Sequence, residues 1–361
     1  MSQTKGSLRS EIRTENMWRL MAKLSPVAVL AMSINSINTF VDALFIGQFL
    51  GEKALAAVSL AFPLSFLANS FAAMLGVGGS SLLSIAIGAK DKKTQKKLFG
   101  IIVCLSVLIS FGLTIFGWIY ARDMIAAIGG EGEVLEMGTL YYRAIVLGAF
   151  FQIFAVSINM LIRAEGKIKA AMNIAMISMV ANMILNPLFI GYFDMGIEGA
   201  AYATILSMLI FAVLDIWYFV NKKATYEVDL THFKLEKELV KPVISVGISA
   251  AMLQLMFVVQ QIVVFKMIAK YGDDWDIAFM GACYRVLILM LVPGFGFSSA
   301  MQPVAGINFG AKDYARVKQS FWIFSIGSTL LTTFLLILFE LFPSIILSLM
   351  LPDATFSPED I

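Results

Sequence analysis

The sequence predicts an all-α polytopic membrane protein, on three observations. Its 361 residues are 59% hydrophobic and only 14% charged, with a mean hydropathy of +0.83, whereas about a quarter of the residues of a soluble domain are charged. Apolar runs of about 20 residues, long enough to cross a bilayer, recur along almost the whole chain. Lys and Arg gather in every second connection between these runs. Each span must be a helix because lipid offers the backbone no hydrogen-bond partners.

Nine spans are expected, and several exceed 25 residues, which implies tilted or kinked helices. In chain order they are residues 24–50, 54–88, 98–121, 134–162, 168–190, 197–220, 240–270, 276–309 and 320–350. The first follows a basic segment, but it is too long for a signal peptide and has no small-residue cleavage site. The N-terminus and every second connection hold 21 of the 27 Lys and Arg. By the positive-inside rule, we expect a multi-pass protein of the plasma membrane with a cytoplasmic N-terminus.

The sequence also contains an internal repeat. "GAKD" occurs at 88–91 and again at 310–313, an offset of 222, and Pro26 corresponds to Pro242 at an offset of 216. A repeat of this length spans six helices, so both copies have the same orientation in the membrane. Parallel repeats of this kind occur in transporters that work by alternating access, with the substrate bound between the halves.

The repeat predicts two parallel six-helix lobes, of which the second is incomplete. The expected parts are an N-lobe with the first six spans (1–220), a cytoplasmic inter-lobe loop (221–239) and a partial C-lobe with spans seven to nine (240–361).

One carboxylate, Asp42, lies in the otherwise uncharged first span. Asn35, Asn38 and Asp42 are at positions i, i+3 and i+7, so they share one helix face with Thr39. A polar stripe on a spanning helix faces protein or water rather than lipid. A carboxylate there loses solvation, which favours taking up a proton or coordinating a cation. The alternative is an aspartate that only hydrogen-bonds neighbouring helices.

The fifth span carries a second polar stripe, in which Asn182 and Asn186 are four residues apart. Pro187 follows, removes a backbone hydrogen bond and so predicts a bend. Thr204 lies in the outer third of the sixth span. Oxygen ligands from a carboxylate, amides and a hydroxyl suit a hard cation. The cation-coupling candidates are therefore Asp42, Asn182, Asn186 and Thr204, and sodium would be held by Asp42, Asn182 and Thr204. Asn and Thr also serve as ordinary interhelical hydrogen-bond partners, and this alternative stays open.

Candidates for a substrate cavity lie in both halves. They are Asn35 and Asn38 on the first span and Gln254 and Gln261, seven residues apart, on the seventh. The 21 Met and 29 Phe offer apolar, adaptable lining. Most of these residues must instead face lipid or pack between helices.

No catalytic centre is predicted. The only histidine, His232, lies in the loop before the seventh span, which excludes a His-based metal site or triad, and we expect no enzyme. Cys104 and Cys283 lie in or beside apolar spans and are expected to be free thiols. Asp215 is expected to reach the cytoplasmic interface. The net charge of +2 is explained by the cytoplasmic loops and indicates no nucleic-acid partner.

Several motifs together resemble one known family. They are "SP" at 25–26, "VDALFIGQFLGEKALAAVSLAFP", "GVGGSSLLSIAIGAKD", "NMILNPLFI", "MGIEGAAYATILS" and "QPVAGINFGAKDYARVK". In this order they resemble the MATE (multidrug and toxic compound extrusion) family, in particular its bacterial MepA/DinF-like branch. The resemblance covers essentially the whole chain and implies a two-lobed antiporter of twelve helices, of which this chain would lack the last three.

The resemblance implies a function and roles for single residues. Members of the family export hydrophobic organic cations in exchange for protons or sodium, and need no cofactor besides this coupling ion. Asp42 would be the coupling-ion carboxylate and Pro26 the bend of the first helix, while Asn182 and Thr204 match positions that join the ion site. Asn186 departs from the family pattern, because many members have an aspartate there.

Two other functions are considered. A lipid-linked oligosaccharide flippase shares the two-lobed architecture, but it would need a cationic cavity for pyrophosphate, and the intramembrane bases are few (Arg143, Lys266 and Arg285). An inactive, truncated remnant that associates with other membrane proteins is the second alternative, suggested by the nine spans.

Overall fold

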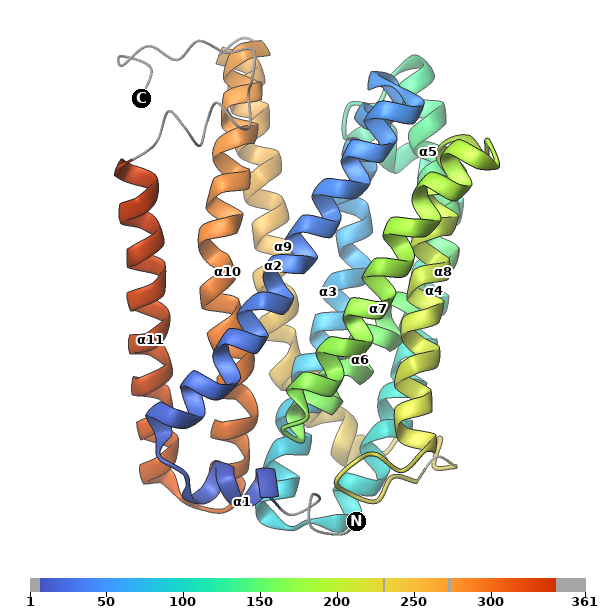
Figure 1. The fold of residues 1–361 in the computed structure, drawn as a ribbon. Helices are drawn as coiled ribbons and strands as arrows, with labels where there is room; N and C mark the ends of the chain where they lie inside the picture. Colours follow the sequence, from blue (N-terminus) through green and yellow to red (C-terminus); the bar gives the residue numbers. More distant parts are fainter. Residues whose placement is uncertain (1–6, 230, 272–273, 342–361) are drawn as a thin grey trace.

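The computed structural model describes residues 7–229, 231–271 and 274–341, with most of their side chains. In these ranges all regular secondary structure is helical (Figure 1). The helices are α1 (Ser7–Thr14), α2 (Met17–Leu50), α3 (Glu52–Ala89), α4 (Lys92–Ala127), α5 (Gly132–Leu147), α6 (Ala149–Ala164), α7 (Ile168–Pro187), the π-helical turn η1 (Leu188–Tyr192), α8 (Gly196–Val220), α9 (Lys237–Tyr271), α10 (Asp274–Gly310) and α11 (Tyr314–Leu341).

The predicted class, an all-α membrane protein, is confirmed. Within the described residues, six helices are long and apolar enough to cross a membrane, or seven if α5 and α6 count as one bent span. The first and eighth predicted spans fall in α2 and α10, where part of the side chains lie outside the described set. The last span coincides with α11 as far as Leu341, and its final residues lie outside the described range.

The fourth predicted span differs from the prediction, because it is broken. Helices α5 and α6 meet at Gly148 with a bend of 51°. A Cβ atom at this position would lie 2.5 Å from Cγ1 of Ile205 on α8. The absence of a side chain therefore lets α8 approach the bend, and glycine also weakens the helix at this point.

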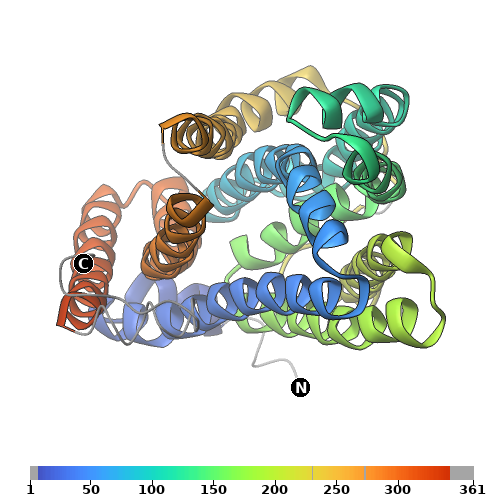
Figure 2. The ribbon, with the colours of Figure 1, turned by 90° about the horizontal axis from the view of Figure 1, so that it is seen from above.

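Helix α3 lies at the centre of the bundle. It packs against α4, α5 and α6 on one side and against α9 and α10 on the other. Figure 2 shows this arrangement from above. Helix α2 runs diagonally, from α10 and α11 near its N-terminal end towards α7 and α8 (Figure 1). Helices α2 and α3 therefore both join the first part of the chain to the last three helices.

The basic connections gather at one end of the molecule. Helix α1, the turns α3–α4, α6–α7 and α10–α11, and the loop between α8 and α9 all lie at the lower end in Figure 1. We call this the basic end, because these segments carry most of the Lys and Arg.

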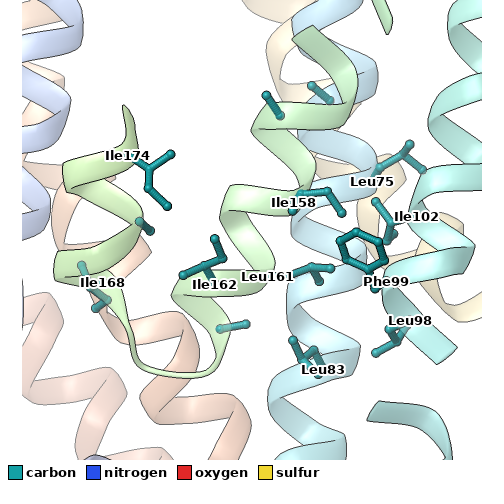
Figure 3. Packing of buried hydrophobic residues seen from close by; sticks show 14 of the residues in the cluster. Leu75, Leu83, Leu98, Phe99, Ile102, Ile158, Leu161, Ile162, Ile168 and Ile174 are labelled. Atoms are coloured by element: carbon teal, nitrogen blue, oxygen red, sulfur yellow. The ribbon is translucent and has the colours of Figure 1, made fainter. Parts of the chain in front are cut away.

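The larger apolar core lies between α3, α4, α6 and α7 (Figure 3). Leu83, Ile102 and Leu161 are among its fully buried side chains. Lipid tails are as apolar as leucine, so these side chains stabilise the bundle by close packing rather than by leaving water. A second cluster, which includes Ile46 and Ile125, packs α2, α3, α4, α5 and α8 at the opposite end.

The repeated "GAKD" motif adopts the same turn in both copies. Lys90 has φ 61° and Lys312 has φ 62°, the left-handed conformation that ends a helix. The amide of Asp91 donates to the carbonyl of Ala86 at 2.9 Å, and the amide of Asp313 donates to that of Asn308 at 2.9 Å. The repeated sequence therefore encodes a repeated backbone conformation.

Replacing Gly247 by alanine should destabilise the contact between α9 and α3. The new Cβ would lie 1.9 Å from the carbonyl oxygen of Met74, and backbone cannot move aside cheaply. We expect a loss of about 1–3 kcal/mol in the free energy of unfolding, measured by thermal unfolding of the purified protein in detergent. Gly112→Ala, with nothing within 4 Å, is the control. Equal melting temperatures for the two variants would contradict the close approach.

Candidate functional site

Asp42 lies among three amides that α2 and α7 bring together. Asn186 on α7 donates from Nδ2 to Asp42 Oδ1 at 2.7 Å. Asn38, one turn before Asp42 on α2, donates from Nδ2 to Asp42 Oδ2 at 3.2 Å. The spacing of four residues explains the second contact, because residues i and i+4 are neighbours on a helix. Both carboxylate oxygens therefore have a buried or half-buried amide donor.

The Asn182 carboxamide can face this carboxylate in two orientations. With its nitrogen towards Asp42, it donates to Oδ1 at 2.8 Å and to Oδ2 at 3.3 Å. With its oxygen towards Asp42, it accepts from Asn38 at 3.3 Å and from Asn186 at 3.4 Å. The second orientation would bring two oxygens face to face, so the hydrogen bonds assign the first, with the nitrogen towards Asp42. Three amide nitrogens therefore surround the carboxylate.

Two further oxygens at the site have no hydrogen-bond partner. They are Oδ1 of Asn38 and Oδ1 of Asn186, and both are buried. Each of these residues turns its nitrogen towards Asp42, so rotating either amide would exchange a donor for an oxygen ligand. A hard cation such as sodium prefers carboxylate and amide oxygens. Among the described residues, no group of three His, Cys, Asp or Glu gathers as a transition-metal site would require.

Thr204, proposed from the sequence as an ion ligand, bonds within its own helix. Its hydroxyl donates to the carbonyl of Ala200 at 3.1 Å. A nearby hydroxyl, that of Ser178, joins α7 to α8 by donating to the carbonyl of Ser207 at 2.6 Å. The structure therefore brings Asn182, Asn186 and Asp42 into hydrogen-bond contact, but not Thr204.

The two prolines predicted to bend helices differ in their surroundings. Helix α7 ends at Pro187 and the π-helical turn η1 follows, so the regular α-helical hydrogen bonding changes at this residue. Helix α2 continues through Pro26, which is exposed.

Of the cavity candidates, Gln254 joins the two parts of the bundle. Its Oε1 accepts from Nδ2 of Asn69 on α3 at 3.2 Å. Gln261, two turns further along α9, is half-buried, and the side chain of Asn35 lies outside the described set. Asn38, also proposed for the cavity, donates to Asp42.

The expectation that Asp215 reaches the interface was wrong. Its side chain is 0% exposed, and its Oδ1 accepts from Nδ2 of Asn159 at 3.3 Å. The oxygen of Asn159 in turn accepts from Nε of Arg163 at 3.1 Å. The sequence position, close to the end of a span, did not show that α6 and α7 would cover this residue.

Glu165 is a second buried carboxylate near the basic end, just beyond α6. It accepts from the hydroxyl of Tyr218 at 2.5 Å and from the hydroxyl of Thr225 at 2.7 Å. Burial raises its pKa above the ordinary value of 4.5, although these hydrogen bonds act in the opposite direction. Glu165 therefore ties the end of α6 to α8 and to the start of the loop that follows α8.

Tyr141 is a buried polar residue that the sequence did not single out. It lies on α5, is 8% exposed and belongs to the same apolar cluster as Ile46 of α2. Asn69 was also not singled out from the sequence, because it is an isolated polar residue in a long apolar helix. Only the fold places Gln254 beside it as a hydrogen-bond partner.

Three comparisons place the chain among known proteins. A family model described as MatE matches residues 27–188 and 249–359. The chain is 27% identical to the "Probable multidrug resistance protein YoeA" of Bacillus subtilis (strain 168), over 94% of this chain and 74% of that protein. It is 27% identical to the "Multidrug export protein MepA" of Staphylococcus saprophyticus, over 76% of this chain but only 60% of that protein. It therefore spans less than two thirds of the second relative.

A solved structure is also similar over most of the chain. It is described as "Outward-facing conformation of a multidrug resistance MATE family transporter of the MOP superfamily". The TM-score is 0.88 and the sequence identity 25%, with 95% of this chain and 76% of that chain covered.

Replacing Asn186 by leucine should destabilise the Asp42 cluster. The change removes the hydrogen bond at 2.7 Å and leaves the half-buried carboxylate of Asp42 without this donor. We expect a loss of about 1–3 kcal/mol in the free energy of unfolding, seen as a lower melting temperature in detergent. Ile184→Leu, at a position 62% exposed on the same helix, is the control. A variant as stable as this control would show that the cluster contributes nothing to stability.

Glu165 should make stability depend on pH. Its folded-state pKa is raised, so the folded protein binds this proton more tightly than the unfolded chain. The stabilisation is complete below about pH 4.5 and is lost as the pH rises through the folded-state value. We expect Glu165→Gln to remove this part of the pH profile of thermal unfolding.

A control for the pH profile comes from Glu227. Hydrogen bonding to Lys96 lowers the pKa of this exposed carboxylate, so Glu227→Gln should alter the profile in the opposite direction. Identical profiles for the Glu165 variant and the unchanged protein would contradict the role of burial.

Proposed function

The chain belongs to the MatE family of multidrug efflux transporters, and from this premise we propose that it is a secondary active antiporter. It exports hydrophobic organic cations in exchange for protons or sodium, by alternating access. The observation that carries the proposal is the cluster of Asp42 with the amides of Asn38, Asn182 and Asn186. Membership of this family also makes the protein a transporter rather than an enzyme.

The cluster has the chemistry that ion coupling needs. An ionisable residue within a membrane span is costly and is usually found on an ion pathway. We infer that the Asn182 amide, whose nitrogen faces the carboxylate, would turn its oxygen to Asp42 when a proton or sodium ion binds, because an amide nitrogen suits a carboxylate and an amide oxygen suits a carboxyl proton or a cation. Binding of a proton or sodium ion at Asp42 therefore rearranges the hydrogen bonds between α2 and α7.

Helix α2 is placed to transmit this change. The half that carries Asp42 packs against α7, whereas the half around Pro26 packs against α10 and α11. A Cβ at Gly296 of α10 would lie 2.7 Å from Cα of Val29, so the backbones of α2 and α10 approach closely. A shift of α2 at the ion site would therefore displace α10 of the second lobe. In this way ion binding would switch the transporter between its inward-open and outward-open states.

The substrate would bind between the lobes. Gln254 lies at their contact, where its side chain accepts a hydrogen bond from Asn69. The names of the relatives refer to multidrug resistance and multidrug export, which supports small organic drugs as the substrate class. The positive-inside rule makes the basic end the cytoplasmic one, and supports a plasma-membrane protein with a cytoplasmic N-terminus.

The flippase alternative is not favoured. Arg143, one of the bases it would require, donates to the carbonyl of Trp118 on α4 at 3.3 Å and lies 5.8 Å from the centre of its ring. It is therefore engaged within the first lobe. Lys266 and Arg285 have side chains outside the described set.

Replacing Asp42 by asparagine should abolish coupled transport, because the amide cannot bind or release the coupling proton and carries no charge for a sodium ion. The measurement is uptake of ethidium into inside-out vesicles that contain this chain, under an imposed proton or sodium gradient. Asp194→Asn, which changes an exposed carboxylate in the loop before α8, should keep full uptake.

The same experiment identifies the coupling ion. Uptake driven only by the proton gradient would assign protons, and uptake driven only by the sodium gradient would assign sodium. Full gradient-driven uptake by the Asp42→Asn variant would refute the role of Asp42. Absence of uptake by folded, unaltered protein would refute the transport function of this chain.

A further inference from the structure

Helices α3 and α10 meet along one face at the basic end, and the residues that meet are related by the internal repeat. From the basic end inwards, the positions are Gly88, Ser84 and Ser80 on α3 and Gly310, Gly306 and Gln302 on α10. Successive positions are four residues apart, so each set lies on one helix face. Each α10 residue is 222 positions after its α3 counterpart, which is the offset of the repeat.

Contact between repeat counterparts locates the axis of the molecule. Two equivalent points touch each other only where the symmetry axis passes between them. The contacts of the glycines have this reciprocity. A Cβ at Gly88 would lie 2.1 Å from the carbonyl oxygen of Ile307, and one at Gly310 would lie 2.0 Å from that of Ile85. Ile85 and Ile307 are themselves 222 positions apart.

The middle pair, Ser84 on α3 and Gly306 on α10, is equally close. A Cβ at Gly306 would lie 1.9 Å from the hydroxyl of Ser84, whose side chain is 0% exposed. Small residues four apart on facing helices let backbones approach in membranes and gain dispersion contacts. This part of the interface therefore depends on the absence of side chains.

Gln302 adds the directional contact. Its Nε2 donates to the hydroxyl of Ser80 at 2.6 Å, and the hydroxyl of Ser81 and the carbonyl of Val77 lie at 3.2 Å and 3.5 Å. No other position of the six has a side chain long enough to cross between the helices. The hydrogen bond forms only when α3 and α10 are in register.

We propose that these six residues, which we call the clasp, hold the basic end closed, and that Gln302 is the positioning residue that sets the register of closure. The inference rests on the proposed alternating access, because two lobes related by an axis must separate at that axis when one end opens. The clasp is built for reversible separation, since it combines dispersion contacts of small residues with one side chain that crosses the interface.

The reporter is a cysteine at Ser84. It is introduced by Ser84→Cys in the full chain after Cys104→Ala and Cys283→Ala, so that it is the only thiol. A water-soluble maleimide added to the protein in detergent or inside-out vesicles reacts only when the clasp is open. The labelling rate therefore follows the fraction of open molecules, and it requires no transport.

Two variants test the two parts of the clasp. Gly310→Ala puts a methyl group against backbone, and should speed labelling by at least about tenfold. Gln302→Met keeps the length of the side chain but removes the donor, and should speed labelling by about five- to tenfold. The matched control is Gly294→Ala on the same helix, where nothing lies within 4 Å; it should label at the original rate.

A cross-link covers the case in which a variant does not fold. In the same background, Ser84→Cys with Gly306→Cys places one thiol on each side of the clasp. A Cβ at Gly306 would lie 2.7 Å from the Cβ of Ser84, so a small movement of the two helices apart brings the cysteines to the distance of a disulfide. The oxidised pair should form readily and block maleimide labelling, and reduction should restore it.

The outcomes separate this inference from the transport function. Labelling that is equally fast in the control, Gly310→Ala and Gln302→Met proteins would overturn the clasp, as would failure of the cysteine pair to cross-link. Faster labelling in both variants would support the clasp even if ethidium uptake were absent, and that absence would count against transport alone.

Discussion

The structure depends on a carboxylate that is kept inside a membrane bundle. A charge there is stable only where hydrogen-bond donors replace its water, and Asp42 receives them from Asn38 on its own helix and Asn186 on α7. This requirement fixes the rotation of α2 and α7 about their axes. The same two amides carry buried oxygens that have no hydrogen-bond partner, and the proposed ion binding would use them as ligands.

Close helix contact is the second constraint, and it links the ion site to the rest of the bundle. Helices α2 and α3 both contact the last three helices, at places where glycine replaces a side chain. Gly247 meets Met74, and Gly296 meets Val29. Because lipid gives little drive for association, such contacts supply much of the stability of a membrane bundle. They are also positions at which a small movement of one helix must displace its neighbour.

Much of the fold was readable from the sequence, but the candidate site was readable only in part. The polar stripes of α2 and α7 predicted that Asp42, Asn182 and Asn186 face protein, and the structure places them together. Helix periodicity cannot show which stripe of one helix meets which stripe of another. Periodicity within α2 put Asn38 on the face of Asp42, and the structure shows their hydrogen bond. The contacts of Asp42 with Asn182 and Asn186 on α7 required the fold, as did the finding that the Thr204 hydroxyl bonds within α8.

The sequence by itself determined the class of the protein, its helices and its repeat, because these depend on local properties: apolar length, the side of the basic connections and similarity between segments. Tertiary structure decided that repeat-related residues of α3 and α10 meet, that Asp215 is buried, and that three amide nitrogens surround Asp42. These features arise from contacts between helices far apart in the chain, whose rotation and register are set by packing of the whole bundle.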